Sequence, residues 1–199
     1  MEIDNEHACA FTGHRPEKLE LDEKYVLSWL EEQIRIAIDD GYREFISGMQ
    51  RGVDIWAAEI VLRIKKEGKP IKLICACAWD GMEDGWNKDW IDRYENVLNE
   101  ANKIVYVGRR PGRESFVERD HWMVDHSSRL IAVFTDVPGG TKETIWYGKR
   151  KGIDIILIQQ SITIACEESD MEKGYCDAEK YVKKYEQAMR ILGNDQPSK

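Results

Sequence analysis

The sequence has few prolines, no long apolar run and no excess of positive charge, and each absence excludes a class of protein. Five prolines among 199 residues, 42% of them hydrophobic, are too few for a long disordered chain. No apolar stretch approaches the ~20 residues that a membrane-spanning helix needs. The first residues are acidic and polar, unlike a signal peptide. We therefore expect a cytoplasmic protein that has no membrane segment.

The formal net charge of the chain is -8 at pH 7. Neutralisation of phosphates by basic residues supplies most of the affinity of non-specific binding to nucleic acids, and anionic membranes attract proteins by the same charge. The acidic balance therefore weighs against nucleic acid or a membrane as a partner. Any polyanion site has to be a local basic patch.

The five cysteines lack the spacing of a zinc site or a disulfide framework. Cys75 and Cys77 alternate within an apolar stretch, so we interpret the cysteines as reduced and mostly buried thiols. His121 and His126 have no further ligand at a usable spacing. We expect neither a metal nor a resident cofactor.

Short apolar runs alternate with helix-like segments along the first three quarters of the chain. The expected strands are residues 8–12, 45–47, 71–78, 104–107, 130–135 and 153–158. The expected helices are residues 22–40, 53–67, 87–101, 115–128 and 142–151. Runs this short and this apolar are typical of strands that are covered on both faces of a parallel sheet. The sequence therefore predicts an α/β fold, a Rossmann-like three-layer sandwich with a mostly parallel sheet of about six strands.

The alternation stops after the last of these strands. We expect residues 1–160 to form the Rossmann-like domain and residues 161–199 to form a C-terminal extension with one amphipathic helix at 177–192. One side of that helix carries Tyr181, Tyr185, Met189 and Leu192. Two interpretations stay open, since the helix can dock on its own domain or form a contact in a homo-oligomer.

Three of the expected strands are followed by glycines and hydrogen-bonding side chains. In open parallel sheets, ligands bind beyond the carboxyl ends of the strands, where loops meet helix N-termini. Arginine can clamp a phosphate with two hydrogen bonds, and successive glycine amides before a helix can bind an anion. The ligand-facing residues expected from these turns are Gly13, His14 and Arg15, then Ser47, Gly48 and Met49, then Gly139, Gly140 and Thr141.

Other interpretations of these turns stay open. Gly13 can simply turn the chain, and His14 can bond a buried carbonyl. Asp54 either caps the helix that it opens or contacts a ribose hydroxyl or a neighbouring loop. The sequence has neither a P-loop nor a dinucleotide-binding fingerprint.

Taken in order, these segments resemble the SLOG superfamily, and most closely its YpsA-like family. The matching stretches read FTGHRP at residues 11–16, SGM at 47–49, GVD at 52–54, AE at 58–59, MVDHS at 123–127, LIAV at 130–133 and GGT at 139–141. The resemblance implies a Rossmann-like fold that binds a nucleotide or a nucleotide-derived phosphorylated ligand. It implies no reaction, because the YpsA-like family has none established, and one other branch, the DNA-protecting DprA proteins, binds single-stranded DNA.

The lysine decarboxylase-like phosphoribohydrolases are distant relatives that carry a helix arginine eight residues before a serine, then a PGGxGTxxE loop. Arg119 lies eight residues before Ser127, so the resemblance implies that Arg119 contacts the ligand. The alternative is a surface ion pair with Glu118 or Asp120. The catalytic glutamate of that loop is missing here, because Thr144 stands in its place, and we expect Thr144 at the site.

These residues predict a nucleotide sensor or regulator, and whether the chain is an enzyme stays open. The first alternative is a hydrolase that cleaves an N-glycosidic or phosphoester bond of a nucleotide-like substrate, with Asp54 or Glu59 as the carboxylate. The second is a single-stranded nucleic-acid adaptor. The basic loop from Arg109 to Arg113 is either a flap that closes over phosphate or a solvated loop. Trp79 is a candidate platform for a base.

Overall fold

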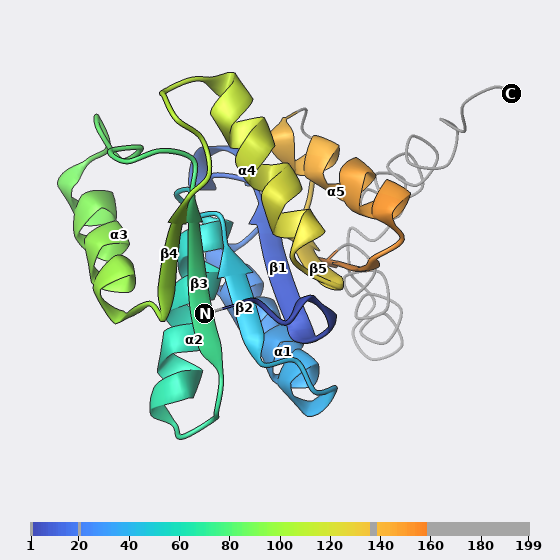
Figure 1. Cartoon of the computed structure of the whole chain (residues 1–199). Helices are drawn as coiled ribbons and strands as arrows, with labels where there is room; N and C mark the ends of the chain where they lie inside the picture. The colour runs from blue at the N-terminus through green and yellow to red at the C-terminus, as the bar shows by residue number, and fades with distance from the viewer. Residues whose placement is uncertain (1, 20, 136–138, 159–199) are drawn as a thin grey trace, which may run out of the picture.

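A computed structural model of the chain describes residues 2–19, 21–135 and 139–158 (Figure 1). Six strands alternate with five α-helices over these ranges, and a 3-10 helix stands on either side of the first strand. The strands are β1 (Ala8–Gly13), β2 (Glu44–Ser47), β3 (Lys72–Cys77), β4 (Lys103–Tyr106), β5 (Arg129–Val133) and β6 (Asp154–Leu157). The helices are η1 (Asn5–His7), η2 (Pro16–Lys18), α1 (Glu23–Asp39), α2 (Val53–Lys66), α3 (Lys88–Glu100), α4 (Arg113–Asp125) and α5 (Gly140–Lys151).

The six strands form one parallel sheet in the order β4-β3-β2-β1-β5-β6. This confirms the predicted α/β Rossmann-like fold, and each expected strand and helix is present with ends that differ by a few residues. The chain first builds outward from β1 to β4 and then returns to place β5 on the other side of β1. The loop after β1 therefore leads to a helix on one face of the sheet, and the loop after β5 leads to a helix on the other face. This leaves a crevice at the carboxyl ends of these two strands.

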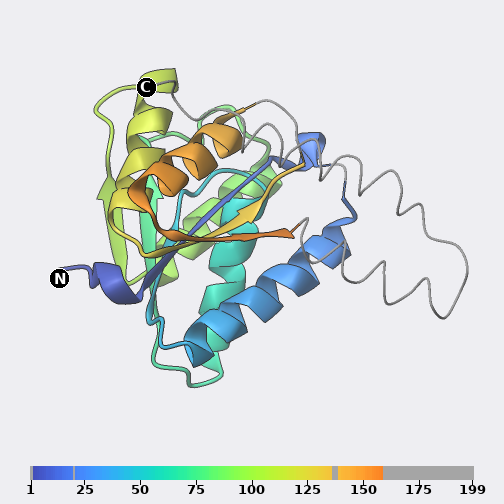
Figure 2. The ribbon, with the colours of Figure 1, turned by 90° about the vertical axis from the view of Figure 1, so that its right-hand side faces the viewer.

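Helices cover both faces of the sheet (Figure 2). Helices α1, α2 and α3 pack on one face over large strand residues such as Phe11 and Phe45. Helices α4 and α5 pack on the other face, where β1 presents the small side chains of Ala8 and Ala10. The alternation along β1 shows why its sequence is apolar throughout, because both of its faces are buried.

The helices begin in two different ways. Helix α1 starts at Asp22, whose side chain accepts a hydrogen bond from the Tyr25 amide, and Asn87 caps α3 in the same manner. Helices α2, α4 and α5 instead follow glycines, and no side chain caps them. Because these glycine starts lie just beyond the carboxyl ends of the strands, the sheet directs uncapped helix N-termini toward the crevice.

The predicted C-terminal extension, residues 161–199 with its amphipathic helix, lies outside the described residues. Among the residues that are described, no helix is both long and apolar enough to span a membrane.

Candidate functional site

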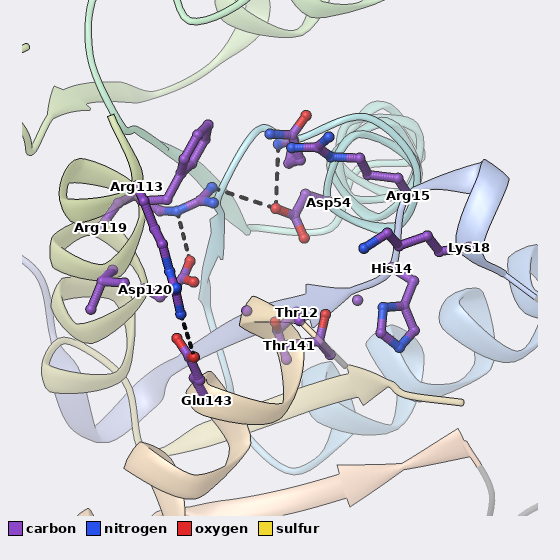
Figure 3. Close-up of a pocket in the computed structure, with 16 residues that line it drawn as sticks. Thr12, His14, Arg15, Lys18, Asp54, Arg113, Arg119, Asp120, Thr141 and Glu143 are labelled. Carbon is purple, nitrogen blue, oxygen red and sulfur yellow. Dashed lines mark hydrogen bonds and ion pairs between the residues drawn. The ribbon is translucent and has the colours of Figure 1, made fainter. Parts of the chain in front are cut away.

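A cavity of about 530 Å³ lies at the carboxyl edge of the sheet, where β1 meets β5 (Figure 3). This volume is within the range of small-molecule sites. Its wall comes from the loop after β1, the turn into α2, the first two turns of α4 and the start of α5. The lining residues are Thr12, Gly13, His14, Arg15, Lys18, Gln50, Asp54, Arg113, Phe116, Val117, Arg119, Asp120, Gly139, Gly140, Thr141 and Glu143.

Two cations and a helix N-terminus face this cavity. Arg15 and Lys18 line it and have no ion-pair partner within the described ranges. Helix α5 begins at Gly139, whose backbone is extended and which supplies no capping side chain. A Cβ built on Gly139 would meet nothing within 4 Å, so the space beside this residue is open, and a Cβ on Gly140 would lie 3.5 Å from Oδ2 of Asp120. This arrangement suits an anion, since the amides and the positive end of the helix dipole point at it.

Arg119 is buried in the opposite wall, where it joins α4 to the turn before α2. Its Nη1 donates a hydrogen bond to the carbonyl oxygen of Gly48 and lies 3.5 Å from Oδ2 of Asp54. Its Nε lies 2.8 Å from Oδ1 of Asp120, in an ion pair that lacks the alignment of a hydrogen bond. The ion pair with Asp120 that the sequence left open therefore exists, but it is in the cavity wall rather than on the surface.

The two carboxylates share this one guanidinium. Burial raises the pKa of Asp54 to about 6, because Arg119 opposes the loss of hydration only in part and Asp120 adds a like charge. Burial also raises the pKa of Asp120, again against the attraction of Arg119. The cluster Asp54–Arg119–Asp120 thus contains one positive charge and two acids that resist ionisation.

The structure brings most of the predicted ligand residues to the cavity. The ones that line it are Gly13, His14, Arg15, Asp54, Arg119, Gly139, Gly140 and Thr141. The ones that do not are Ser47, Gly48, Met49, Glu59 and Thr144.

Most residues of the second group hold the turns in shape. The Ser47 hydroxyl donates to the carbonyl oxygen of Asp54 at 2.8 Å and accepts from the Met49 amide at 3.2 Å. Met49 is fully buried with a positive φ of 60°. The Thr144 hydroxyl donates to the carbonyl of Gly140 at 2.9 Å. These residues therefore support the loops that line the cavity, and their contact with a ligand stays a prediction.

Gly13 and Gly48 are required by close packing inside the protein. A Cβ on Gly13 would lie 2.5 Å from the side chain of Val53 at the start of α2. A Cβ on Gly48 would lie 2.7 Å from both Cζ of Arg119 and Oδ2 of Asp54. These glycines let β1, the turn after β2 and Arg119 approach one another, which sets the shape of the cavity.

Glu59 does not belong to this site. Its carboxylate accepts two hydrogen bonds from Arg93 of α3, at 2.7 and 2.5 Å. Glu59 follows Asp54 by five residues, which turns it by about 140° around the helix axis. The structure therefore leaves Asp54 as the candidate carboxylate. Asp54 does not cap α2, because the cap position is Gly52 and Oδ2 of Asp54 instead accepts from the Gln50 amide at 3.3 Å.

His14 is an uncharged member of the wall. Burial, together with a smaller effect of the nearby Lys18 charge, lowers its pKa to about 4. Its ring packs against Phe134 with 5.6 Å between the ring centroids, and its Nε2 has no hydrogen-bond partner in the described part of the chain. Nε2 of His14 therefore does not bond a buried carbonyl among the described residues.

Several lining residues were not predicted from the sequence, namely Thr12, Lys18, Gln50, Phe116, Val117, Asp120 and Glu143. The helical turn that carries Lys18 could have been predicted, because proline favours the first position of a helix. Pro16 does open η2, and Lys18 at its end lines the cavity. Asp120 had been considered only as a surface partner of Arg119. Trp79, the candidate base platform, does not line the cavity but packs edge-on against Phe116. Trp86 and Trp90 pack against the core.

The basic loop lines a second cavity of about 640 Å³, with Arg109, Arg110 and Arg113 on its wall together with Glu114 and Glu118. Arg113 also borders the first cavity, where it forms an ion pair with Glu143 at 2.8 Å (Figure 3). Within the described ranges, no group of three or more His, Cys, Asp or Glu side chains is arranged to hold a metal ion.

Comparison with known proteins gives matches in sequence and in structure. Residues 9–152 match the model of a family described as the YspA SLOG family. UPF0398 proteins of Bacillus thuringiensis (strain Al Hakam) and Bacillus cereus (strain AH187) are each 28% identical over 152 residues, which cover 72% of this chain and 83% of theirs.

Two solved structures of DNA processing protein A share the fold. The protein from Helicobacter pylori, described as having a unique single-stranded DNA binding mode, aligns with a TM-score of 0.54 and 16% identity over 77% of this chain. The protein from Streptococcus pneumoniae aligns with a TM-score of 0.55 and 15% identity over 76% of this chain. The chain spans only 66% and 50% of the lengths of these two proteins.

Proposed function

The chain belongs to the YspA SLOG family, and on that premise we propose that it binds a nucleotide or a nucleotide-derived phosphorylated ligand as a sensor or regulator. One observation carries the proposal. Arg15 and Lys18, which have no ion-pair partner in the described ranges, share a single cavity with the uncapped N-terminus of α5.

The ligand phosphate would bind at the start of α5. There it would accept hydrogen bonds from the open amides of Gly140 and Thr141, and the charges of Arg15 and Lys18 would neutralise it. The cavity of about 530 Å³ leaves room for a sugar and a base beside the phosphate. The buried Arg119 would keep the far wall in place.

Thermal-shift and calorimetric titration with AMP, ADP, ADP-ribose and NAD test this proposal. A ligand at 100 times its Kd stabilises the folded state by roughly 2.7 kcal/mol. The double variant Arg15→Ala with Lys18→Ala should bind the best ligand at least 10-fold more weakly. The matched control removes two exposed cations from the other end of α5, Lys149→Ala with Arg150→Ala, and should bind normally. The proposal fails if none of the four compounds binds or if both double variants lose the same affinity.

A hydrolase remains a second candidate function because of Asp54. A carboxyl group in the cavity wall with a pKa of about 6 can give or take a proton near neutral pH. Incubation of the best ligand with the protein, followed by detection of released base or phosphate, tests for turnover. If product forms equally fast with Asp54→Asn, then Asp54 is not the carboxylate.

Binding of single-stranded DNA is a third candidate. The structural neighbour from Helicobacter pylori has this property, and the second cavity collects three arginines despite the acidic balance of the chain. A gel shift with single-stranded DNA at near-physiological salt decides it. A shift that Arg109→Ala with Arg110→Ala abolishes would support this role, and the absence of a shift would exclude it.

A further inference from the structure

Two neighbouring residues that line the first cavity have wholly apolar side chains. Apart from glycines, its lining residues carry charges, hydroxyls, an amide or an imidazole, with the exception of Phe116 and Val117. These two residues follow one another on α4 and are only partly buried. Apolar surface that stays exposed in a polar cavity is unfavourable in water, and a flat ligand group that covers it recovers that free energy.

The Phe116 ring is held from two sides. Trp79, two residues after the end of β3, meets it edge-on with 4.8 Å between the ring centroids and 66° between the ring planes. The guanidinium carbon of Arg119, one turn further along α4, lies 5.7 Å from the ring centroid. Arg119 is itself fixed by Gly48 and Asp120. The ring therefore has a supported position before any ligand arrives, which lowers the entropic cost of stacking on it.

We propose that Phe116 is the platform on which a planar base of the ligand stacks, so that the cavity selects nucleotides over sugar phosphates and inorganic phosphates. The inference rests on the proposed function, because it assumes that the phosphate binds at the start of α5. Helices α4 and α5 pack side by side on the same face of the sheet, so one small molecule reaches both (Figure 1). Stacking tolerates every base, and this platform therefore selects for the presence of a base rather than for its identity.

Calorimetric titration of the wild-type protein compares AMP, GMP and ADP-ribose with ribose 5-phosphate and pyrophosphate. At least one of the base-containing ligands should bind 10-fold more tightly than ribose 5-phosphate, and a factor of 10 corresponds to about 1.4 kcal/mol. In Phe116→Leu, which keeps apolar volume but removes the aromatic face, this advantage should disappear while ribose 5-phosphate binds as before. Phe116→Tyr should restore it. Val117→Ala serves as the control, and it should change the affinity for both kinds of ligand equally.

Tryptophan fluorescence gives a second measurement that a merely structural role would not change. Base-containing ligands should alter the emission of the wild-type protein, because Trp79 touches the platform, and ribose 5-phosphate should not. The difference should vanish in Trp79→Phe, which retains the other six tryptophans. Equal affinities for AMP, GMP, ADP-ribose and ribose 5-phosphate in the wild-type protein overturn the role of Phe116 but leave the phosphate site intact. If no compound of the series binds, the proposed function itself is wrong, and so is the proposed role of Phe116.

Discussion

Nη1 of Arg119 lies 3.5 Å from Oδ2 of Asp54, and both side chains are more than nine-tenths buried. This contact joins α4, on one face of the sheet, to the first turn of α2, on the other face, at the edge where the cavity opens. The site and the packing of the two helical layers therefore depend on the same pair of side chains.

Replacement of Arg119 by methionine should lower the free energy of unfolding by about 3–5 kcal/mol. The change leaves the carboxyl groups of Asp54 and Asp120 buried without their common cation. Removal of one partner from a buried ion pair is strongly destabilising, because the charge that remains is uncompensated. Urea denaturation measures the effect. Arg113→Met is the control, because its pair with Glu143 is exposed and such pairs contribute about 1 kcal/mol or less. Similar losses in the two variants would show that the buried cluster contributes no more to the free energy of unfolding than an exposed ion pair does.

The stability of the protein should depend on the ionisation of Asp54. Its pKa is about 6 in the folded state and near 3.8 when exposed, so the unfolded chain releases this proton first. The contribution of the protonated carboxyl is complete below about pH 3.8 and is lost as the pH rises through 6. The difference between a pKa of 3.8 and one of about 6 corresponds to roughly 3 kcal/mol.

Asp54→Asn keeps the shape of this side chain but cannot ionise. Its free energy of unfolding, relative to the wild-type protein, should therefore increase between pH 4 and pH 7 by up to about 3 kcal/mol. Urea denaturation at a series of pH values tests this. Parallel curves for the two proteins over that range would mean that Asp54 titrates at its ordinary pKa in the folded state.

Gly139→Asp should raise stability and weaken ligand binding at the same time. Aspartate caps helices slightly better than glycine does, so we expect a gain of a few tenths of a kcal/mol. The same carboxylate would occupy the place of the ligand phosphate and repel it, which should weaken nucleotide binding at least 10-fold. Gly139→Ala is the matched control, since its Cβ meets no neighbour, and it should bind normally. Thermal unfolding and calorimetry measure the two effects, and full affinity in the aspartate variant would place the phosphate elsewhere.

Gly48→Ala should destabilise the protein by about 1–3 kcal/mol, because the added methyl group would overlap the guanidinium of Arg119 and approach Oδ2 of Asp54 to 2.7 Å. Gly139→Ala makes the same chemical change in open space and should cost less, about 0.5–1 kcal/mol, because alanine caps a helix less well than glycine. Urea denaturation measures the free energies of unfolding of the two variants, which can then be compared. If both variants cost equally little, Arg119 has room to move and the wall of the cavity is not fixed.

Local patterns predicted the elements of this fold, and they could not predict how the strands neighbour one another. The segment expected as a helix at residues 53–67 forms α2 (Val53–Lys66), since its apolar residues recur at helical spacing. No comparable local signal specifies that β1 pairs with both β2 and β5. The pairing of β1 with β5 joins residues 120 positions apart, such as Cys9 and Arg129, and periodicity does not encode a contact over that separation.

The same limit applies to the site. The sequence correctly indicated which turns meet at the carboxyl edge, because parallel strands bring their ends together. It did not indicate which side chains of a turn face the cavity and which face the protein. Ser47 has the chemistry of a ligand contact, yet its hydroxyl is used by the backbone of Asp54 and Met49. Asp120 was expected only as a surface partner of Arg119, because its proximity to the turn before α2 arises only when α4 packs against the sheet.

The ion pair between Arg113 and Glu143 has a consequence for how fast a ligand can enter. It lies at the exposed rim of the cavity, with 83% and 50% of the two side chains accessible to solvent. Exposed pairs of this kind are weak, and side chains at a surface change rotamer within nanoseconds. The pair would therefore open and close many times during a single encounter. Entry would be limited by diffusion, and the lifetime of the complex would be set by the buried contacts beneath the rim.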